Sequence, residues 1–383
     1  MDEALSTFLS EVRLPRLEAV EIPIYDALGR VLAEDAVSNE DLPPFDRSAV
    51  DGYALRACDT FEASQLKPTM LKLTESDQVE ANEAKEIWTG NTLPDGADAV
   101  VMLEYTRKVD GGIELLNLIN PSENVSKKGE DVRKGDVAVK AGTRLKPHHI
   151  GMLAALGMTC LKVVRQPKVA ILSTGGELVE PGEKPKPDQI INTNRLILSG
   201  MCRELSADPV DLGITKDDAN EIEAKIRRGL EEADLVITTG GTSVGYPDLV
   251  PTVVSRLGSP GIIVHGVAMR PGTPTALAAI DNKPIFILSG YPVAAMMGFE
   301  TFVRPVILKL SGVGSEPRPV LGAKLTRRVA SALGRRVFLR VYAFRKNGQF
   351  YAEPIRTKGS GVLSTMIKAN GYVTIPENRE GLE

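Results

Sequence analysis

The 383-residue chain contains few cysteines and few histidines, and each shortage excludes a class of function. The three cysteines, Cys58, Cys160 and Cys202, lie far apart and show neither zinc-ligand spacing nor a disulfide framework, so we expect free thiols and a cytoplasmic protein. With three histidines in all, a histidine-based metal site or a Ser–His triad is not expected. The net charge of −4 lacks the basic surplus of nucleic-acid binders, and no run is long enough to span a bilayer. We therefore expect neither a nucleic-acid nor a membrane partner.

The pattern of apolar runs, glycines and prolines along the chain predicts a multidomain α/β protein with four domains. Strands that alternate with helices predict a doubly wound, mostly parallel α/β domain, whereas short apolar runs separated by glycine and proline predict β-rich domains. The predicted domains are a discontinuous helical N-terminal/linker domain (1–40 with 140–165), a β-rich inserted domain (41–139), the α/β domain (166–311) and a C-terminal β-barrel-like domain (312–383). Helices are expected over 2–9 and 146–156, and a long one from Pro292 to Leu310. Over 26–33 we expect a helix that ends near Gly29 and then a strand.

The segment from Thr238 to Asp248 combines glycines, hydroxyls and one acid directly after an apolar run that reads as a buried strand. Backbone N–H groups at such a strand end can bind an anion, and glycines with a nearby acid suggest a phosphorylated ligand held with a divalent metal. The alternative is a tight strand-to-loop connection with polar filler, because a lone glycine loop is weak evidence.

Three further loops follow predicted strands in the same way, and in a doubly wound sheet ligands bind outside the carboxyl ends of the strands. We therefore expect one crevice lined by the four loops, which are 174–177, 238–248, 270–274 and 289–292. None of the four has the dinucleotide-binding glycine spacing or a P-loop, so neither a nicotinamide enzyme nor an ordinary P-loop ATPase is supported.

Charged residues at these strand ends suit a phosphate–metal site. Glu177, Asp217 and Asp248 are predicted at the same edge of the sheet, and Mg²⁺ favours one or two carboxylates plus waters and substrate phosphates. We expect Glu177 and Asp248 to hold the metal. Arg270 can pair with an oxyanion. The alternatives are a solvated turn acid for Glu177, a helix cap for Asp217 and an ordinary surface arginine for Arg270.

The predicted β-rich domain contains a second dense polar segment, from Asp46 to Ala54. Its Asp51-Gly52 pair can be a hairpin turn, but a turn alone does not account for the acids, the arginine and the serine beside it. Thr89-Gly90 and Gly129-Glu130-Asp131 follow further on, and each can be a plain turn.

Six ordered motifs together resemble the molybdopterin molybdenumtransferases, the MoeA and gephyrin E-domain family. They are Asp46–Ala54, Thr89-Gly90 with Gly96–Met102, Gly129–Asp131, Ser173–Leu178, Asn192–Arg195 and Gly240–Asp248, and the resemblance extends to Gly359-Ser360-Gly361. It implies an L-shaped, four-domain homodimer whose site lies between the α/β domain of one subunit and the β-rich domain of the other. It also implies the reaction, in which adenylylated molybdopterin and molybdate (or tungstate) give molybdenum cofactor, AMP and water. The molybdopterin adenylyltransferase is a further expected partner.

The resemblance assigns roles by motif. The catalytic residues it implies are Asp51, Thr89 and Asp131 in the β-rich domain and Glu177, Asp217 and Asp248 in the α/β domain, with Mg²⁺ as the cofactor. The expected substrate-binding residues are Thr174, Gly175, Gly240, Gly241, Thr242, Ser243, Gly245, Arg270, Pro271, Gly272, Ser289, Gly290, Pro292, Arg340 and Ser360, of which Arg340 and Ser360 match positions implicated in oxyanion binding.

Two loops depart from the family pattern. Thr273 stands where many members have a second lysine, and Ser289-Gly290-Tyr291-Pro292 replaces Pro-Gly-Asn-Pro. These changes leave the choice between molybdate and tungstate open. Two rival functions also remain: a molybdopterin adenylyltransferase of the same fold, and a non-catalytic dimeric scaffold.

Overall fold

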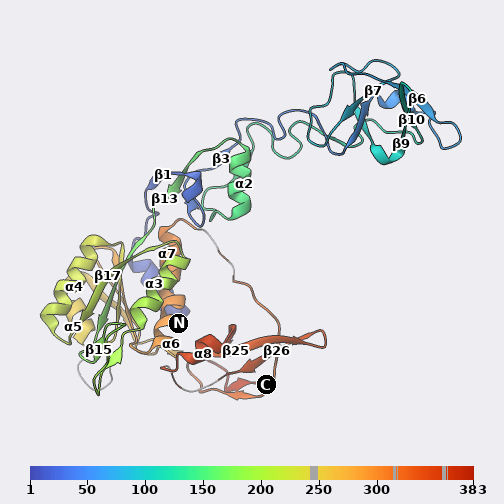
Figure 1. Cartoon of the computed structure of the whole chain (residues 1–383). Helices are drawn as coiled ribbons and strands as arrows, with labels where there is room; N and C mark the ends of the chain where they lie inside the picture. The colour runs from blue at the N-terminus through green and yellow to red at the C-terminus, as the bar shows by residue number, and fades with distance from the viewer. Residues whose placement is uncertain (242–248, 314–315, 317, 356–358, 360) are drawn as a thin grey trace.

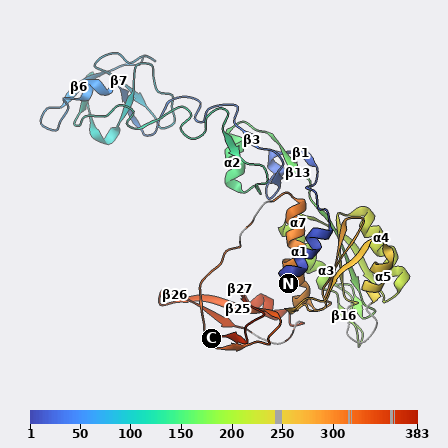
Figure 2. The same ribbon diagram turned by 180° about the vertical axis from the view of Figure 1, so that it is seen from behind.

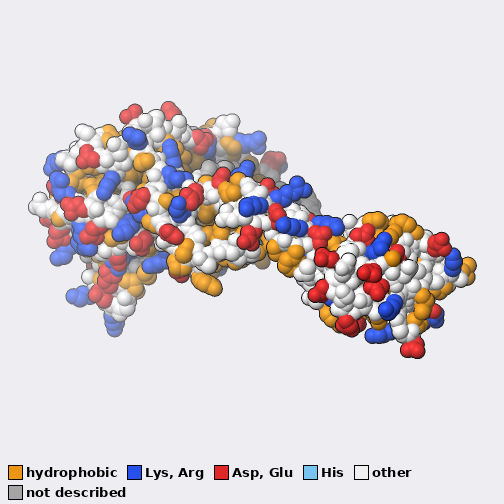
Figure 3. All heavy atoms as spheres, turned by 90° about the horizontal axis from the view of Figure 1, so that it is seen from above, with side chains coloured by type: hydrophobic (Ala, Val, Ile, Leu, Met, Phe, Trp, Pro, Cys, Tyr) orange, Lys and Arg blue, Asp and Glu red, His pale blue; other side chains and the backbone are white. Residues whose placement is uncertain are grey.

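The computed structural model describes residues 1–241, 249–313, 316, 318–355, 359 and 361–383. Figure 1 shows an α/β body, a long arm that carries a β-rich tip away from the body, and a C-terminal sheet beside the body. Seen from above in Figure 3, the visible face carries acidic and basic side chains interspersed, with no large single-sign patch. Within the described ranges, no helix has the length and apolar character needed to cross a membrane.

The α/β body is a six-stranded sheet in the order β17-β14-β18-β22-β21-β19. Four strands are parallel, namely β14 (Lys168–Thr174), β17 (Asp208–Thr215), β18 (Leu235–Thr239) and β22 (Lys283–Leu288). Of the other two, β21 (Ala276–Ile280) runs antiparallel to both of its neighbours, β22 and β19 (Pro260–His265), so β19 runs in the same direction as the four parallel strands. The inner strands are almost continuous apolar runs because both of their faces are covered.

Helices cover both faces of this sheet, which confirms the predicted doubly wound fold (Figures 1 and 2). One face packs on α1 (Asp2–Glu11), α3 (Asn194–Glu204), α6 (Pro292–Gly298) and α7 (Arg304–Leu310). The other face packs on α4 (Ala219–Glu232) and α5 (Leu249–Leu257). The long helix expected over 292–310 is confirmed as a continuous helical stretch, but it is not one regular α-helix, because a π-helical turn (η4, Phe299–Val303) joins α6 to α7. Pro305 lies in the first turn of α7, and because it has no N–H it cannot donate a regular α-helical hydrogen bond there.

The arm begins with a three-stranded sheet of β1 (Ala19–Pro23), β13 (Cys160–Val164) and β2 (Val31–Leu32), next to α2 (Pro147–Ala155). Over 26–33 the predicted strand after Gly29 is confirmed as β2, whereas the predicted helix before Gly29 is wrong. A short 3-10 turn (η1, Ile24–Asp26) is followed by Gly29 at φ +76° and then by β2. Backbone bonds to distant residues decide this, since Leu32 N–H donates to the Thr143 carbonyl at 3.0 Å. Beyond this sheet, β3 (Ala36–Val37) pairs with β12 (Val137–Val139).

The tip is a six-stranded sheet in the order β8-β5-β7-β6-β10-β9. Its strands are β5 (Gly52–Leu55), β6 (Thr69–Leu73), β7 (Glu83–Ile87), β8 (Ala99–Met102), β9 (Thr106–Val109) and β10 (Gly112–Leu115), and β4 (Arg47–Ser48) pairs separately with β11 (Val125–Ser126). Gly52 is required at the start of β5, because a Cβ there would lie 1.8 Å from the Val101 carbonyl oxygen. The residue after Asp51 therefore cannot carry a side chain.

The C-terminal sheet has the order β20-β25-β26-β23, with β27 also paired to β25. Its strands are β20 (Met269–Arg270), β23 (Lys324–Leu325), β25 (Arg336–Lys346), β26 (Gln349–Pro354) and β27 (Gly371–Ile375), and β24 (Val329–Ala330) pairs with β28 (Gly381–Leu382). A short helix, α8 (Ser364–Lys368), lies within the stretch predicted to be β. Because β20 leaves the α/β segment and pairs with β25, this sheet is attached to the body at the edge where β22 ends.

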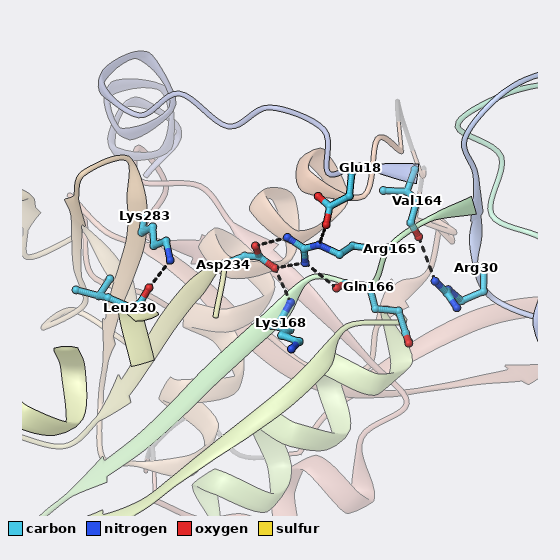
Figure 4. A network of polar contacts seen from close by, with 9 residues as sticks. All are labelled: Glu18, Arg30, Val164, Arg165, Gln166, Lys168, Leu230, Asp234 and Lys283. Carbon is cyan, nitrogen blue, oxygen red and sulfur yellow. Dashed lines mark hydrogen bonds and ion pairs between the residues drawn. The ribbon is translucent and has the colours of Figure 1, made fainter. Parts of the chain in front are cut away.

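A cluster of polar contacts joins the arm to the body (Figure 4). Arg165 follows β13, and its guanidinium donates to both carboxylate oxygens of Asp234 at 2.7 Å each and forms an ion pair with Glu18, the residue before β1. Asp234 also accepts the Lys168 backbone N–H at 2.8 Å. Arg165 therefore holds the arm, at the end of β13 and the start of β1, against the start of the α/β sheet.

Candidate functional site

A large cleft of about 1870 Å³ lies at the carboxyl edge of the α/β sheet, between the body and the C-terminal sheet. Thirteen of the predicted site residues line it together: Thr174, Gly175, Glu177, Asp217, Gly240, Gly241, Arg270, Pro271, Gly272, Ser289, Gly290, Pro292 and Arg340. Five others, Thr242, Ser243, Gly245, Asp248 and Ser360, lie outside the described residues. Its volume exceeds the roughly 300–1,000 Å³ of a typical small-molecule pocket, so it accommodates an elongated ligand.

The glycines at this edge allow neighbouring loops to cross closely. Gly240 has φ +92°, and a Cβ there would lie 2.2 Å from the Thr174 carbonyl oxygen. Its N–H donates to the Leu288 carbonyl at 3.3 Å, and the N–H of Gly175 donates to the Thr215 carbonyl at 3.1 Å. These two N–H groups are therefore used within the fold, and an anion at this edge needs other donors.

Two acids line the cleft next to each other at the ends of β14 and β17. Asp217 accepts the Gly176 N–H at 3.4 Å, which places its carboxylate beside the turn that carries Glu177. The helix cap considered for Asp217 is instead Asp218, whose side chain accepts the Asn220 and Glu221 N–H groups at 2.9 Å each. The Asp217 carboxylate therefore faces the cleft and does not cap α4.

The cleft fits Mg²⁺ only in combination with a ligand. In the part of the chain that the structure describes, no group of three or more His, Cys, Asp or Glu side chains could hold a metal ion. Glu177 and Asp217 supply two carboxylates at one edge, and Mg²⁺ typically takes one or two carboxylates, several waters and substrate phosphates. The donor set therefore suits a magnesium ion that arrives with a phosphorylated substrate.

Arginines line the opposite part of the cleft. Arg270 lies on β20 and Arg340 on the adjoining β25, where Arg340 is 4% exposed and burial lowers the pKa of its guanidinium. Arg335 also lines the cleft, and it was missed in the sequence. Its neighbour Arg336 is instead paired with Asp2 and Glu377. The signal for Arg335 was the run Gly334-Arg335-Arg336 directly before an apolar strand.

Two asparagines of the Asn192–Arg195 motif also line the cleft, although they were not among the predicted site residues. Asn194 donates through Nδ2 to the Gly290 carbonyl at 2.8 Å, which ties the start of α3 to the loop after β22. Asn194 Oδ1 and Asn192 Nδ2 are buried and have no hydrogen-bond partner among the described residues. Unsatisfied buried polar atoms are costly, so their presence in the cleft wall suits a polar ligand.

Asp51 and Thr89 form a well-defined pair in the tip. One carboxylate oxygen of Asp51 accepts both the backbone N–H and the hydroxyl of Thr89, at 2.8 Å each. These two bonds lower the pKa of Asp51, the backbone bond contributing most. Asp131 is exposed in the same part of the molecule, and its N–H donates to the Leu42 carbonyl at 3.0 Å.

None of these three tip residues lines the cleft of its own chain. The arm separates the tip from the body, as Figures 1 and 2 show. One chain therefore presents two separate halves of the predicted site: the cleft residues in the body and Asp51, Thr89 and Asp131 in the tip.

Comparison with known proteins finds relatives over nearly the whole chain. Residues 1–157 match the MoeA N-terminal region (domain I and II), 170–309 a probable molybdopterin binding domain and 322–383 the MoeA C-terminal region (domain IV). The chain is 41% identical to a putative molybdopterin biosynthesis protein of Methanocaldococcus jannaschii (100% of this chain, 93% of the relative) and 34% identical to the molybdopterin molybdenumtransferase of Haemophilus influenzae (99% and 95%). The crystal structure of a molybdopterin biosynthesis MoeA protein from Pyrococcus horikoshii superposes with a TM-score of 0.84 at 35% identity (100% and 96%).

Proposed function

The chain belongs to the MoeA family, and on that premise we propose that it is a molybdopterin molybdenumtransferase that inserts molybdate or tungstate into adenylylated molybdopterin and releases AMP. The observation that carries the proposal is the single cleft in which acids, glycine loops and arginines converge at the carboxyl edge of the sheet. Curated relatives named as this enzyme match at 32–34% identity along almost their full length.

The order of the strands supports an orientation for the substrate. Asp217 and Glu177 lie at the ends of β17 and β14, whereas Arg270 lies beyond β21 and β22 near Arg335 and Arg340. We assign the phosphoanhydride to the acidic end, where Mg²⁺ bound by Glu177 and Asp217 would neutralise its charge. The oxyanion belongs at the arginine end, where guanidinium groups bind oxygen atoms in pairs. Asp248 stays a proposed metal ligand outside the described residues.

The cleft residues would accelerate the reaction mainly by position and charge. Asn194, held by Gly290, and the closely crossed glycine loops form a rigid wall. A rigid wall aligns the oxyanion with the dithiolene, and fixed positive groups stabilise charge that develops during exchange. Wall and arginines belong to different segments, so their relative position depends on the pairing of β20 with β25.

Asp51, Thr89 and Asp131 would complete the site from a second subunit. The proposal is supported by their exposure in the tip and by their absence from the cleft of their own chain. The Asp51 carboxylate, kept ionised by Thr89, would orient the oxyanion or the water released. A homodimer in which each tip reaches the other body gives two such sites.

A mixture of two inactive variants tests the shared site. Asp51→Asn and Glu177→Gln each disable one half, so neither homodimer should release AMP. When the two variants are co-expressed, heterodimers should form in which the intact body of one chain meets the intact tip of the other. These heterodimers should release AMP from that one intact site. Ultracentrifugation should show dimers for all three samples. If the mixed dimers form but stay inactive, the shared site is wrong.

The dependence on the oxyanion tests the reaction itself. Purified protein with adenylylated molybdopterin should release AMP only when molybdate or tungstate is added, and the faster of the two identifies the preferred ion. Adenylylation of molybdopterin from ATP without oxyanion would indicate the adenylyltransferase instead. Absence of both reactions would indicate a scaffold.

We also propose a cytoplasmic location and the molybdopterin adenylyltransferase as a partner. The location is supported by Cys58, Cys160 and Cys202, which are all free thiols.

A further inference from the structure

Within the described part of the chain, one aromatic ring is exposed inside the cleft. Among the described lining residues, the large apolar side chains that remain exposed are Tyr291 at 61%, Ile190 at 56% and Ile191 at 42%. Phe338 also lines the cleft, but it is 8% exposed and packs into the core of the body. Among the lining residues that the structure describes, Tyr291 is therefore the aromatic face available to a ligand.

Tyr291 is held firmly although its ring is exposed. It lies between the end of β22 and the start of α6, its N–H donates to Ser289 Oγ at 3.3 Å, and its carbonyl accepts the Ala295 N–H at 2.9 Å. The ring itself lies against Gly361, where an added Cβ would approach two ring carbons, Cδ1 and Cε1, to 3.1 and 3.5 Å. A glycine therefore leaves room for the ring, which the C-terminal segment supports on one side.

Tyr291 also lies between the two charged parts of the cleft. The end of β22 follows β18 in the order of the sheet, so it separates the acids after β17 and β14 from Arg270 and its neighbours beyond β21. A ligand that spans both parts passes the tyrosine. In the proposed substrate, each of the two ends of the phosphoanhydride carries a flat heteroaromatic ring, the pterin on one side and the adenine on the other.

We propose that Tyr291 stacks on one of these flat rings and so sets the position of the substrate along the cleft. The inference rests on the proposed function for the identity of the substrate, but stacking needs only a flat ring, because every heteroaromatic base offers a π face. Tyr291 is then a substrate-positioning residue, and this role is an addition to those of the charged residues around it. If Tyr291 instead had a purely structural role, in which its ring only packs against Gly361 and so holds the C-terminal segment on the body, ligand binding would respond differently to its replacement.

Binding measurements separate the two roles and the two rings. Calorimetric titration with Mg²⁺–AMP reports on adenine, and titration with molybdopterin reports on pterin. For Tyr291→Ala we expect about 5- to 100-fold weaker binding of one ligand, the effect of losing one stacking contact, and for Tyr291→Phe a change within about 2-fold. Tyr342→Ala is the matched control, since Tyr342 is 49% exposed on β25 and does not line the cleft. In turnover, KM should rise with kcat nearly unchanged, because stacking holds substrate and transition state alike.

Each other outcome has a defined meaning. If Tyr291→Ala binds both ligands as the wild type does, or if Tyr291→Phe loses as much as Tyr291→Ala, the stacking role is wrong. Equal loss of both ligands together with a lower melting temperature indicates the structural role and also overturns it. If one ligand depends on Tyr291 but the wild type never releases AMP in response to an oxyanion, the stacking role stands and the insertion reaction fails.

Discussion

Replacing Arg165 with methionine should weaken the junction between the arm and the body. Methionine keeps much of the apolar stem of the arginine but removes both bonds to Asp234 and the ion pair with Glu18. The Asp234 side chain is 17% exposed and would keep one bond, from the Lys168 N–H at 2.8 Å. Arg165→Met therefore leaves a mostly buried carboxylate with one of these three hydrogen bonds.

The expected loss lies between two known limits. Breaking a fully buried ion pair costs about 3–5 kcal/mol, and losing an exposed pair costs about 0–1 kcal/mol. The side chains of Arg165 and Asp234 are 27% and 17% exposed, so we expect about 2–3 kcal/mol. For a domain of about 150–250 residues, a loss of about 2–3 kcal/mol corresponds to a melting temperature lower by about 5–10 °C.

Calorimetry of the intact protein measures the shift, and amide hydrogen exchange in β14 and β18 shows whether the body is the part that loosens, since a multidomain chain need not unfold in one step. Arg228→Met is the matched control, because Arg228 pairs with Glu232 on the solvent-facing side of α4 and the loss of this exposed pair should cost about 0.3–0.5 kcal/mol. Equal shifts for the two variants would refute the reasoning.

The same junction has a predicted pH dependence. The pKa of the Glu18 carboxyl lies below its ordinary value of 4.5. The main cause is the hydrogen bond from the backbone N–H of Glu18 itself, and the second is the hydrogen bond from Arg165. A lowered pKa in the folded state means that the stabilisation is present above the unfolded pKa and is lost as pH falls through the folded pKa. In Arg165→Met this acid-sensitive part should shrink, which melting curves between neutral and acidic pH will show.

Three further substitutions test local features. Thr89→Val removes one of the two bonds that lower the pKa of Asp51, so the acidic limb of the pH–rate profile should move to higher pH while the basic limb stays unchanged. Asp218→Ala removes the cap of α4 and should cost about 1 kcal/mol in urea unfolding, whereas Asp218→Asn should cost little. Gly240→Ala should cost about 2 kcal/mol or more, because its Cβ meets the Thr174 carbonyl and φ is +92°; a fully stable variant would contradict the close crossing.

The fold was predictable from sequence where local patterns decide it. The α/β body follows from apolar runs alternating with helical periodicity, and these patterns persist because the strands are covered on both faces. In the stretch 26–33 the predicted strand forms as β2, but the predicted helix before Gly29 is a turn, because the backbone there pairs with the distant segment around Thr143 and with β13. Such long-range bonds leave no local signal.

The site was predictable in part for a related reason. Loops at strand ends converge at one edge whatever their sequence, so thirteen predicted residues meet in one cleft. Arg335 was missed because its role depends on the pairing of β20 with β25, which attaches the C-terminal sheet to that edge. Asp217 and Asp218 were indistinguishable by sequence, since one residue decides which carboxylate caps α4 and which faces the cleft.

The chain leaves the arm for the tip through β3 and returns through β12, and these strands are paired, with Val37 opposite Val137 and Ala36 opposite Val139. Paired backbone positions lie about 5 Å apart, a gap that a two-residue turn can close. The tip is therefore a replaceable insertion. We expect that residues 38–136 can be replaced by a short turn, or by the equivalent segment of a relative, without changing the path of the chain on either side.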